Sequence, residues 1–213
     1  MHIIDLGLVD YCTALEEQQR VHARVVEGSL PATLILCRHY PVITAGRSSK
    51  PDSLLLPRHE YFERGIEVID ADRGGDVTYH APGQLIAYPI YPMAAYGNDL
   101  HAYLRSLEEA VMETLKPFGI DAGRRKGLTG VWVENRKIAS IGIAVRHWTS
   151  YHGISLIVKS KGLEEFSLIR PCGSDAVMTS IEAEAGRTVL FDDVAHYLIR
   201  SLSHDQCYAA AAR

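Results

Sequence analysis

The stretch that most restricts the fold is residues 73–92, RGGDVTYHAPGQLIAYPIYP. A helix is excluded there, because proline lacks an N–H donor and its ring collides with the preceding helical turn. The paired glycines at its start permit positive φ and allow a ligand to approach the backbone closely. Polar side chains follow at Thr78, Tyr79, His80 and Gln84. The stretch is therefore a candidate ligand loop, although paired glycines alone are weak grounds for one.

The regions around this stretch show the periodicities of regular elements. Helices are expected at 8–28, 98–116, near 175–185 and at 192–203. Strands are expected at 32–37, 41–45, 66–70, 129–134, 137–145 and about 153–158, with a tight turn at Glu134–Arg136. Strands that neighbour one another between helices predict an α+β fold with a central mixed β-sheet flanked by helices. No linker stands out in the 213 residues, so we expect one domain over 1–213, with an Ala-rich tail from about 206 that is disordered or loosely attached.

Composition removes several classes of protein. The apolar fraction of 47% and the charged fraction of 23% are close to globular averages, which argues against disorder, collagen and coiled coils. The net charge of −4 disfavours a nucleic-acid partner. No apolar run approaches the roughly 20 residues of a membrane helix, and the first residues lack the pattern of a secretory signal. Four cysteines without CxxC spacing indicate a reducing compartment, so we expect a cytoplasmic protein.

One cysteine differs from the others in its setting. Cys37 closes an apolar strand and Cys12 lies on the apolar side of the first expected helix, so both are predicted to be inert core residues, whereas Cys207 lies in a polar tail. Cys172 stands in a loop between Pro171 and Gly173. A helix beginning just after this loop would lower the pKa of the thiol. At this point a catalytic thiol and an ordinary loop cysteine both remain open.

Lys137 is the second unusual residue. It opens the strand KIASIGIAV, and strict alternation would place it on the face of Ala139, Ile141, Ile143 and Val145. Such a lysine either extends to solvent at the strand end or lines a pocket, where a lowered pKa would suit an acid or base. No GxxxxGK[ST] phosphate loop occurs, and His80, His152 and Cys172 lack the spacing of a zinc site. We therefore expect no metal.

Several motifs together resemble a known family. Residues 73–84 resemble the R-G-G-x-x-T-Y-H-G-P-G-Q signature of octanoyltransferases, the lipoyl(octanoyl) transferase family of lipoate biosynthesis, which is related to lipoate and biotin protein ligases. Further matches follow in the expected order: TGVWVENRKIASIG at 129–142, HGIS at 152–155 and PCG at 171–173. PVITAGR at 41–47 is similar to the early strand of the family.

The resemblance implies a biotin/lipoate protein ligase-like fold and an acyltransferase. An octanoyl group, with lipoyl as second candidate, would pass from octanoyl-acyl carrier protein to the ε-amine of a lysine. The acceptors would be lipoyl domains of 2-oxoacid dehydrogenases and the glycine cleavage H protein. Cys172 would carry the acyl group as a thioester, and Lys137 would lower the thiol pKa and act as acid and base. The substrate-binding residues implied are Arg73, Gly74, Gly75, Asp76, Val77, Thr78, Tyr79, His80, Ser140, Ile141, Gly142, Gly153, Ile154 and Ser155.

The chemistry of the residues agrees with that reading. Amide formation from a thioester is downhill, so no ATP, cofactor or metal is expected, and no nucleic-acid or membrane partner; we expect a monomer. Small residues at Ala139, Ser140 and Gly142 would leave room for an acyl chain. Ala81 replaces the usual glycine of the signature, Ile157 replaces a common asparagine, and the stretch after Cys172 is one residue shorter than the family pattern.

Three other functions stay open. The first is an ATP-dependent lipoate-protein ligase, the second a non-catalytic homologue that binds carrier protein, and the third a Cys–His hydrolase with His80 or His152 as base.

The distribution of charge adds one further hypothesis. Residues 122–162 hold eight Lys/Arg (124, 125, 126, 136, 137, 146, 159 and 161) and one acidic residue, Glu134. This stretch is either a docking face for an acidic carrier protein or an ordinary solvated face.

Overall fold

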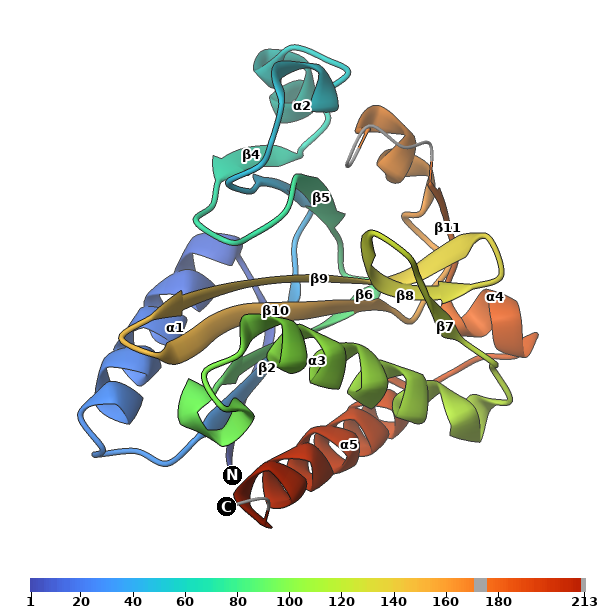
Figure 1. Ribbon diagram of the computed structural model, residues 1–213. Helices are drawn as coiled ribbons and strands as arrows, with labels where there is room; N and C mark the ends of the chain where they lie inside the picture. Colours follow the sequence, from blue (N-terminus) through green and yellow to red (C-terminus); the bar gives the residue numbers. More distant parts are fainter. Residues whose placement is uncertain (171–175, 212–213) are drawn as a thin grey trace.

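The computed structural model describes residues 1–170 and 176–211, with side chains placed as far as Ser203 (Figure 1). The helices are α1 Tyr11–Val26, α2 Arg58–Glu63, α3 Leu100–Leu115, α4 Ile181–Ala185 and α5 Phe191–Ala211, with short 3-10 turns η1 Pro51–Ser53, η2 Met93–Tyr96, η3 Lys116–Phe118 and η4 Glu164–Leu168. The strands are β1 His2–Val9, β2 Thr33–His39, β3 Val42–Ala45, β4 Glu67–Asp70, β5 Val77–His80, β6 Gln84–Ile90, β7 Gly123–Arg125, β8 Leu128–Val133, β9 Arg136–Arg146, β10 Thr149–Ile157 and β11 Val177–Met178.

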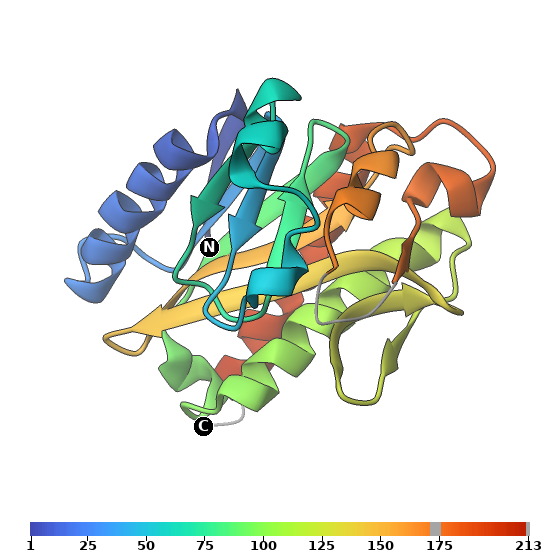
Figure 2. The same cartoon turned by 90° about the horizontal axis from the view of Figure 1, so that it is seen from above.

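The larger sheet has the order β1-β2-β6-β10-β9-β8-β7, and β11 also pairs with β9. β1 runs parallel to β2 and β11 parallel to β9, whereas the other pairs are antiparallel. This is the predicted mixed sheet. A smaller sheet of order β4-β3-β5 lies over the β6–β10–β9 part of the larger one (Figure 2).

Alternation along β2 and β6 separates two cores. Leu34, Leu36, Leu85 and Ala87 face the cluster that α3 and α5 cover, whereas Ile35, Cys37, Ile86 and Tyr88 face the cluster that α1 covers. Successive side chains of a strand point to opposite faces, and in β2 and β6 both sets of side chains are apolar. Each of these strands therefore has two apolar faces. Helices therefore flank the larger sheet on both sides. A third cluster fills the space between the smaller sheet, α2 and η4.

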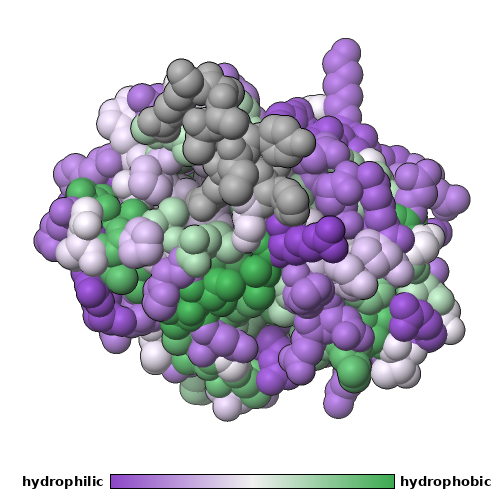
Figure 3. Space-filling view, turned by 90° about the horizontal axis from the view of Figure 1, so that it is seen from below, coloured by the Kyte–Doolittle hydropathy of each residue, from purple (hydrophilic) through white to green (hydrophobic). Residues whose placement is uncertain are grey.

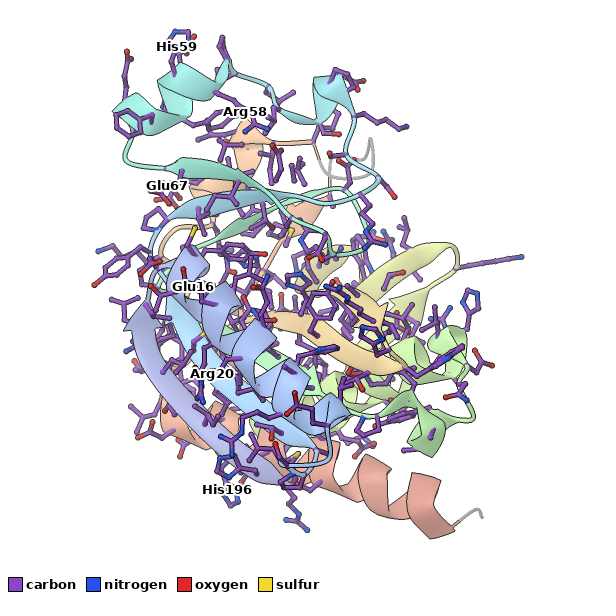
Figure 4. The ribbon with its side chains drawn as sticks, turned by 90° about the vertical axis from the view of Figure 1, so that its left-hand side faces the viewer. Glu16, Arg20, Arg58, His59, Glu67 and His196 are labelled. Carbon is purple, nitrogen blue, oxygen red and sulfur yellow. The ribbon has the colours of Figure 1, made fainter. Side chains whose placement is uncertain are left out.

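The exposed sides of the helices are mostly polar. Glu16 and Arg20 lie on the outer side of α1, away from the sheet (Figure 4). Seen from below, hydrophilic residues predominate, with a large hydrophobic patch near the centre and smaller hydrophobic groups towards the edges (Figure 3). Among the described residues, no helix combines the length and apolarity that a bilayer crossing requires.

Several expected elements differ from the structure. β1 was not predicted, and the helix expected at 8–28 begins only at Tyr11, because Asp10 caps it by accepting the Thr13 N–H. The helix expected near 175–185 is restricted to Ile181–Ala185, after the short strand β11 and the cap Ser180. The final helix reaches Ala211 rather than 203. The remaining expected strands and the helix at 98–116 are present, with Asp99 as the cap of α3.

Candidate active site

A cavity of about 430 Å³ lies on the α1 side of the larger sheet. That volume is within the range of about 300–1,000 Å³ that small-molecule sites occupy. All predicted substrate-binding residues except Tyr79 line it. Tyr79 is 2% exposed and packs into the core of the smaller sheet, with its ring against Phe166. The position of Tyr79 in β5, between the pocket-lining Thr78 and His80, explains this, because alternate side chains of a strand point away from each other.

Small residues on two paired strands create much of this space. Ser140 of β9 faces Ser155 of β10, and Gly142 faces Gly153. All four line the cavity. Ala139, which we expected to widen the pocket, instead points to the opposite face and is fully buried in the core beneath α3. Of the three small residues from which we predicted an acyl slot, Ser140 and Gly142 thus line the cavity, whereas Ala139 does not.

The loop that opens the signature stretch is held against β9. The N–H of Gly74 donates to the carbonyl of Ile143 at 2.8 Å. A Cβ on Gly142 would come within 2.9 Å of the Gly74 carbonyl oxygen, so a glycine is needed for this approach. Arg73 is buried, and its guanidinium donates to the carbonyl and hydroxyl of Thr44. Arg73 thus fastens the loop to the smaller sheet.

Asp76 has a similar structural role. One carboxylate oxygen accepts the Val77 N–H at 2.7 Å, and the other accepts the Ser53 hydroxyl at 2.9 Å. The predicted residues Arg73 and Asp76 therefore line the pocket while their charged groups bond within the protein. Ala81, which replaces the signature glycine, is buried with an ordinary negative φ, since it is absent from the residues with positive φ. The substitution therefore causes no backbone strain in the described structure.

A buried cluster of aromatic rings adjoins the cavity, and we call it the histidine–tyrosine cluster: Tyr11, His39, His80, Tyr88 and His152. Burial lowers the pKa of all three histidines, and it raises the pKa of Tyr11 to about 12. The imidazoles are therefore neutral near pH 7. His39 bonds the Tyr88 hydroxyl at 2.7 Å, and His80 bonds the side-chain oxygen of Gln84 at 3.2 Å.

His152 is held in an unusual conformation. Its φ of +56° lies in the left-handed region, although it stands within β10. Gln18 of α1 accepts its backbone N–H at 2.9 Å, and its Nε2 lies 2.7 Å from an Asp72 carboxylate oxygen. Because burial keeps the imidazole neutral, Nε2 carries the proton and donates it in this bond. The hydrogen bond from His152 lowers the pKa of Asp72 against the opposing effect of burial.

The Lys137 side chain faces the cavity because of an irregularity in β9. Val131 pairs with Ala139, yet the next residue, Trp132, pairs with Lys137, so Ile138 is an extra residue in β9. Such a bulge reverses the alternation of side chains. Lys137 therefore lies on the face of Ser140 and not, as we predicted, on the face of Ala139. Its Nζ lies 5.5 Å from the centroid of the Trp132 ring.

Cys172 lies outside the described residues, as do its neighbours from 171 to 175. The residues on either side of that gap are next to the cavity. The N–H of Arg170 donates to Ser53, Ala176 and Met178 line the cavity, and Met178 pairs with Lys137 in β11. The helix expected just after Gly173 begins only at Ile181. The first helix that the structure describes after residue 175 is therefore α4, which starts later than the helix expected near 175–185.

The other cysteines with described side chains are Cys12 and Cys37. Cys37 is buried as predicted, and burial raises the pKa of its thiol. Cys12 is exposed, which corrects the prediction that it lies in the core. The buried stripe of α1 runs through Tyr11, Ala14 and Gln18, so the helix is rotated from the phase that the sequence periodicity indicated.

The basic stretch 122–162 is partly neutralised by ion pairs. Arg124 pairs with Glu108 and Glu109, Arg136 with Glu134 and Glu184, and Lys159 with Glu182. Lys126 is exposed in the turn between β7 and β8, next to the pocket-lining residues 127–129. Among the described residues, at least Arg124, Arg136 and Lys159 of the eight predicted docking charges are thus paired with carboxylates of the protein.

Some pocket residues were not predicted from the sequence. Tyr11 reaches the cavity from α1, Tyr88 from β6 and Trp132 from β8. The Tyr11 hydroxyl and the Trp132 indole N–H are buried, and neither has a hydrogen-bond partner among the residues that the structure describes. Trp132 lies in the same TGVWVENRK motif as Lys137, so the sequence could have indicated that Trp132 lies near the pocket. No local pattern marks Tyr11. No group of three or more potential metal ligands occurs among the residues that the structure describes.

Comparison with known proteins decides the family. A model of the lipoyl protein ligase A/B catalytic domain matches residues 10–203. The protein belongs to this family. The octanoyltransferase of Geobacter metallireducens is 44% identical over 91% of this chain and 88% of its own length. That of Nitratidesulfovibrio vulgaris is 45% identical over 87% and 85%. The predicted octanoyltransferase resemblance, the acyltransferase class and the function in protein lipoylation are confirmed.

Solved structures of low sequence identity share the fold of the present protein. A lipoate-protein ligase A bound with ATP has a TM-score of 0.72 at 17% identity, covering 96% of this chain and 84% of that one. A biotin protein ligase from Aquifex aeolicus has a TM-score of 0.56 at 13% identity, covering 98% and 70%. These similarities confirm the predicted ligase-like fold.

Proposed function

We propose that this protein moves an octanoyl group from an acyl carrier protein to a lysine of a lipoyl domain, through a thioester on Cys172. The observation that carries the proposal is the position of Lys137. The β9 bulge turns the Lys137 side chain toward the cavity. Met178 of β11, three residues after the 171–175 segment, pairs with Lys137 in the sheet. This arrangement supports a reaction centre in which Lys137 moves protons for the Cys172 thiol.

In the first step the Cys172 sulfur attacks the thioester carbonyl of the carrier. Its proton passes to Lys137, and the carbon–sulfur bond to the carrier breaks. Lys137 returns the proton to the departing carrier thiolate. The products are octanoyl-Cys172 and the free thiol of the carrier, so no co-reactant is consumed. Backbone N–H donors near the carbonyl would stabilise the oxyanion of this step.

In the second step the acceptor lysine attacks octanoyl-Cys172 as a neutral amine. The amine loses a proton to Lys137, an amide bond forms, and the thiolate leaves. Protonation by Lys137 restores the thiol. A positioned base is needed because the free acceptor amine is almost fully protonated at neutral pH.

The cavity has room for the acyl chain. An extended chain advances about 1.3 Å per bond, the value implied by about 3.8 Å across the three bonds between successive Cα atoms. The seven carbon–carbon bonds of an octanoyl group then span about 9 Å. From Lys137 to Gly142 β9 rises by about 17 Å at roughly 3.3 Å per residue. Ser140, Gly142, Gly153 and Ser155 line the space along this length, which supports them as the acyl-binding wall.

We place the donor and acceptors among acidic carrier domains: octanoyl-acyl carrier protein on one side, and lipoyl domains of 2-oxoacid dehydrogenases and the glycine cleavage H protein on the other. The exposed Lys126 beside the cavity supports an electrostatic contact with them. The protein would act as a monomer in the cytoplasm. The exposed thiol of Cys12 fits a reducing compartment.

Trapping the acyl-enzyme tests the proposal. The protein is mixed with octanoyl-acyl carrier protein, and its intact mass is measured after acid quenching. We expect the mass of one octanoyl group on the protein, and none on Cys172→Ser. Cys12→Ser is the matched control, because it removes an exposed thiol and should still acquire the group. An unchanged mass of the unmodified chain, or an octanoyl group on Cys172→Ser, contradicts the proposal.

A further inference from the structure

Glu108 of α3 is a buried carboxylate that the proposed reaction does not use. Its side chain is 1% exposed and lies between apolar core residues of α3, Leu107 and Val111. A charge buried in this way is costly unless it is paired and hydrogen-bonded. One oxygen accepts from Arg105 at 2.5 Å and from Arg124 at 2.9 Å. The other oxygen accepts the backbone N–H of Gly130 at 3.0 Å.

Gly130 forms the surface over which the end of Lys137 passes. Its φ is +128°, a conformation that residues with a side chain rarely adopt. A Cβ there would lie 2.7 Å from Cε and 3.3 Å from Nζ of Lys137, and 2.6 Å from the carbonyl oxygen of Ala139. The space that a side chain at residue 130 would fill is thus occupied by the end of Lys137, and we call this space the lysine slot. The centroid of the Trp132 ring lies 5.5 Å from Nζ of Lys137.

The strand pairing of β8 is irregular on both of its edges near Gly130. The register between β7 and β8 is irregular between Gly123 and Arg125, and the register between β8 and β9 shifts between Val131 and Trp132. Gly130 therefore lies between two irregular ladders. The carboxylate of Glu108, on α3, supplies the acceptor for its N–H.

We propose that Glu108 is a positioning residue for Lys137: by holding the Gly130 backbone, it fixes the slot that directs the lysine to the reaction centre. The inference rests on the proposed function, in which Lys137 moves the protons. It assigns a task to a buried charge on α3 that does not line the described cavity.

Two substitutions separate the hydrogen bond from the charge. Glu108→Gln keeps one oxygen that can accept from Gly130, while its amide NH2 replaces the oxygen that accepts from Arg105 and Arg124, so these arginines must turn to solvent; Glu108→Leu removes both oxygens. The two arginines remain solvated in both variants, since their side chains are 56% and 34% exposed. We expect Glu108→Gln to keep kcat within about threefold, the effect of weakening one hydrogen bond. We expect Glu108→Leu to lower kcat about 10- to 100-fold, the cost of misplacing a reacting group by about 1 Å, with KM for the carrier protein unchanged.

Arg124→Met is the matched control. It removes the ion pairs to Glu108 and Glu109 but leaves the Gly130 hydrogen bond. We expect a lower melting temperature with kcat within about threefold of the unmodified chain. If Glu108→Leu does not fold, the control and Glu108→Gln decide the question. A tenfold loss of kcat in either of them would overturn the proposal.

A double-mutant cycle with Lys137→Ala separates positioning from general stability. We expect Glu108→Leu to lower the residual activity of Lys137→Ala no further. An equal loss in both backgrounds, or full kcat in Glu108→Leu alone, overturns the positioning role. Full activity of Lys137→Ala would instead refute the role of Lys137 in the proposed function, and the positioning role with it. The two failures therefore give different results.

Discussion

Adding one methyl group at Gly142 tests the close approach on which the pocket depends. The new Cβ would lie 2.9 Å from the Gly74 carbonyl oxygen and 3.3 Å from Cδ of Arg73. Overpacking of this kind costs about 1–3 kcal/mol. Alanine recovers about 0.5–1 kcal/mol, because glycine is entropically unfavourable in a strand. The net loss expected for Gly142→Ala is therefore centred on about 1.3 kcal/mol within a range of about 0–2.5 kcal/mol. The central value corresponds to about 3–5 °C in melting temperature for a domain of this size.

Activity should fall more than stability. The 73–75 loop must move away from β9 to accommodate the methyl group, and Gly74 and Gly75 line the cavity. We expect kcat/KM for octanoyl-acyl carrier protein to fall at least about tenfold, since small displacements of positioning groups are costly. Calorimetry gives the melting temperature, and transfer to a lipoyl domain gives the rate.

Alanine substitutions at two other glycines of the same sheet serve as controls, one without a steric clash and one with a more severe clash. Gly123 of β7 has ordinary φ and nothing within 4 Å of a built Cβ, whereas at Gly153 of β10 the Cβ would meet the Ala87 carbonyl oxygen at 2.3 Å. Gly123→Ala should leave the melting temperature unchanged or raise it slightly, and Gly153→Ala should lower it more than Gly142→Ala. If Gly142→Ala behaves like Gly123→Ala in both stability and activity, the loop does not shape the pocket as described.

Three further predictions follow from charge and burial. Because the pKa of each histidine in the histidine–tyrosine cluster is lowered by folding, the unfolded chain binds more protons below about pH 6.5. Their contribution to stability is therefore complete above that pH and is lost on acidification, by at most about 1.4 kcal/mol per pH unit for each histidine. Melting temperatures between pH 7 and 5 check this, and a constant value would contradict it. Lys126→Glu should raise KM for carrier protein and flatten its salt dependence. Arg64→Glu, at the C-cap of the distant α2, should change neither; equal effects would remove the docking role. In the native protein iodoacetamide should label Cys12 but not Cys37, and mass spectrometry of labelled Cys37 would show that its burial is wrong.

The pocket wall was predictable because its residues come in short motifs. Residues 73–80, 140–142 and 153–155 each form one continuous stretch, and the sheet brings the three together through pairs such as Ser140 with Ser155. Tyr79 was the exception, because a motif does not state which of two strand faces a residue occupies.

The orientation of Lys137 was beyond sequence pattern alone. Alternation assigned it to the face of Ala139, and the extra residue Ile138 reverses that assignment. The sequence KIASIGIAV at 137–145 contains no pattern that predicts a bulge, because the bulge arises from how β9 pairs with β8. Tyr11 was missed for a related reason, since α1 reaches the cavity only through packing on the sheet. From sequence alone Arg124 reads as a surface charge, because its partner, Glu108, is 16 residues away on another element.

The most direct test of the account is the fate of the isolated acyl-enzyme. Octanoyl-enzyme is separated from carrier protein and mixed with a lipoyl domain in the absence of ATP. Quenched samples are weighed by mass spectrometry over time. We predict that the octanoyl group moves from the enzyme to the lipoyl domain at least as fast as steady-state turnover. Release as free octanoate, retention on the enzyme, or transfer only after ATP is added would contradict the thioester mechanism on Cys172.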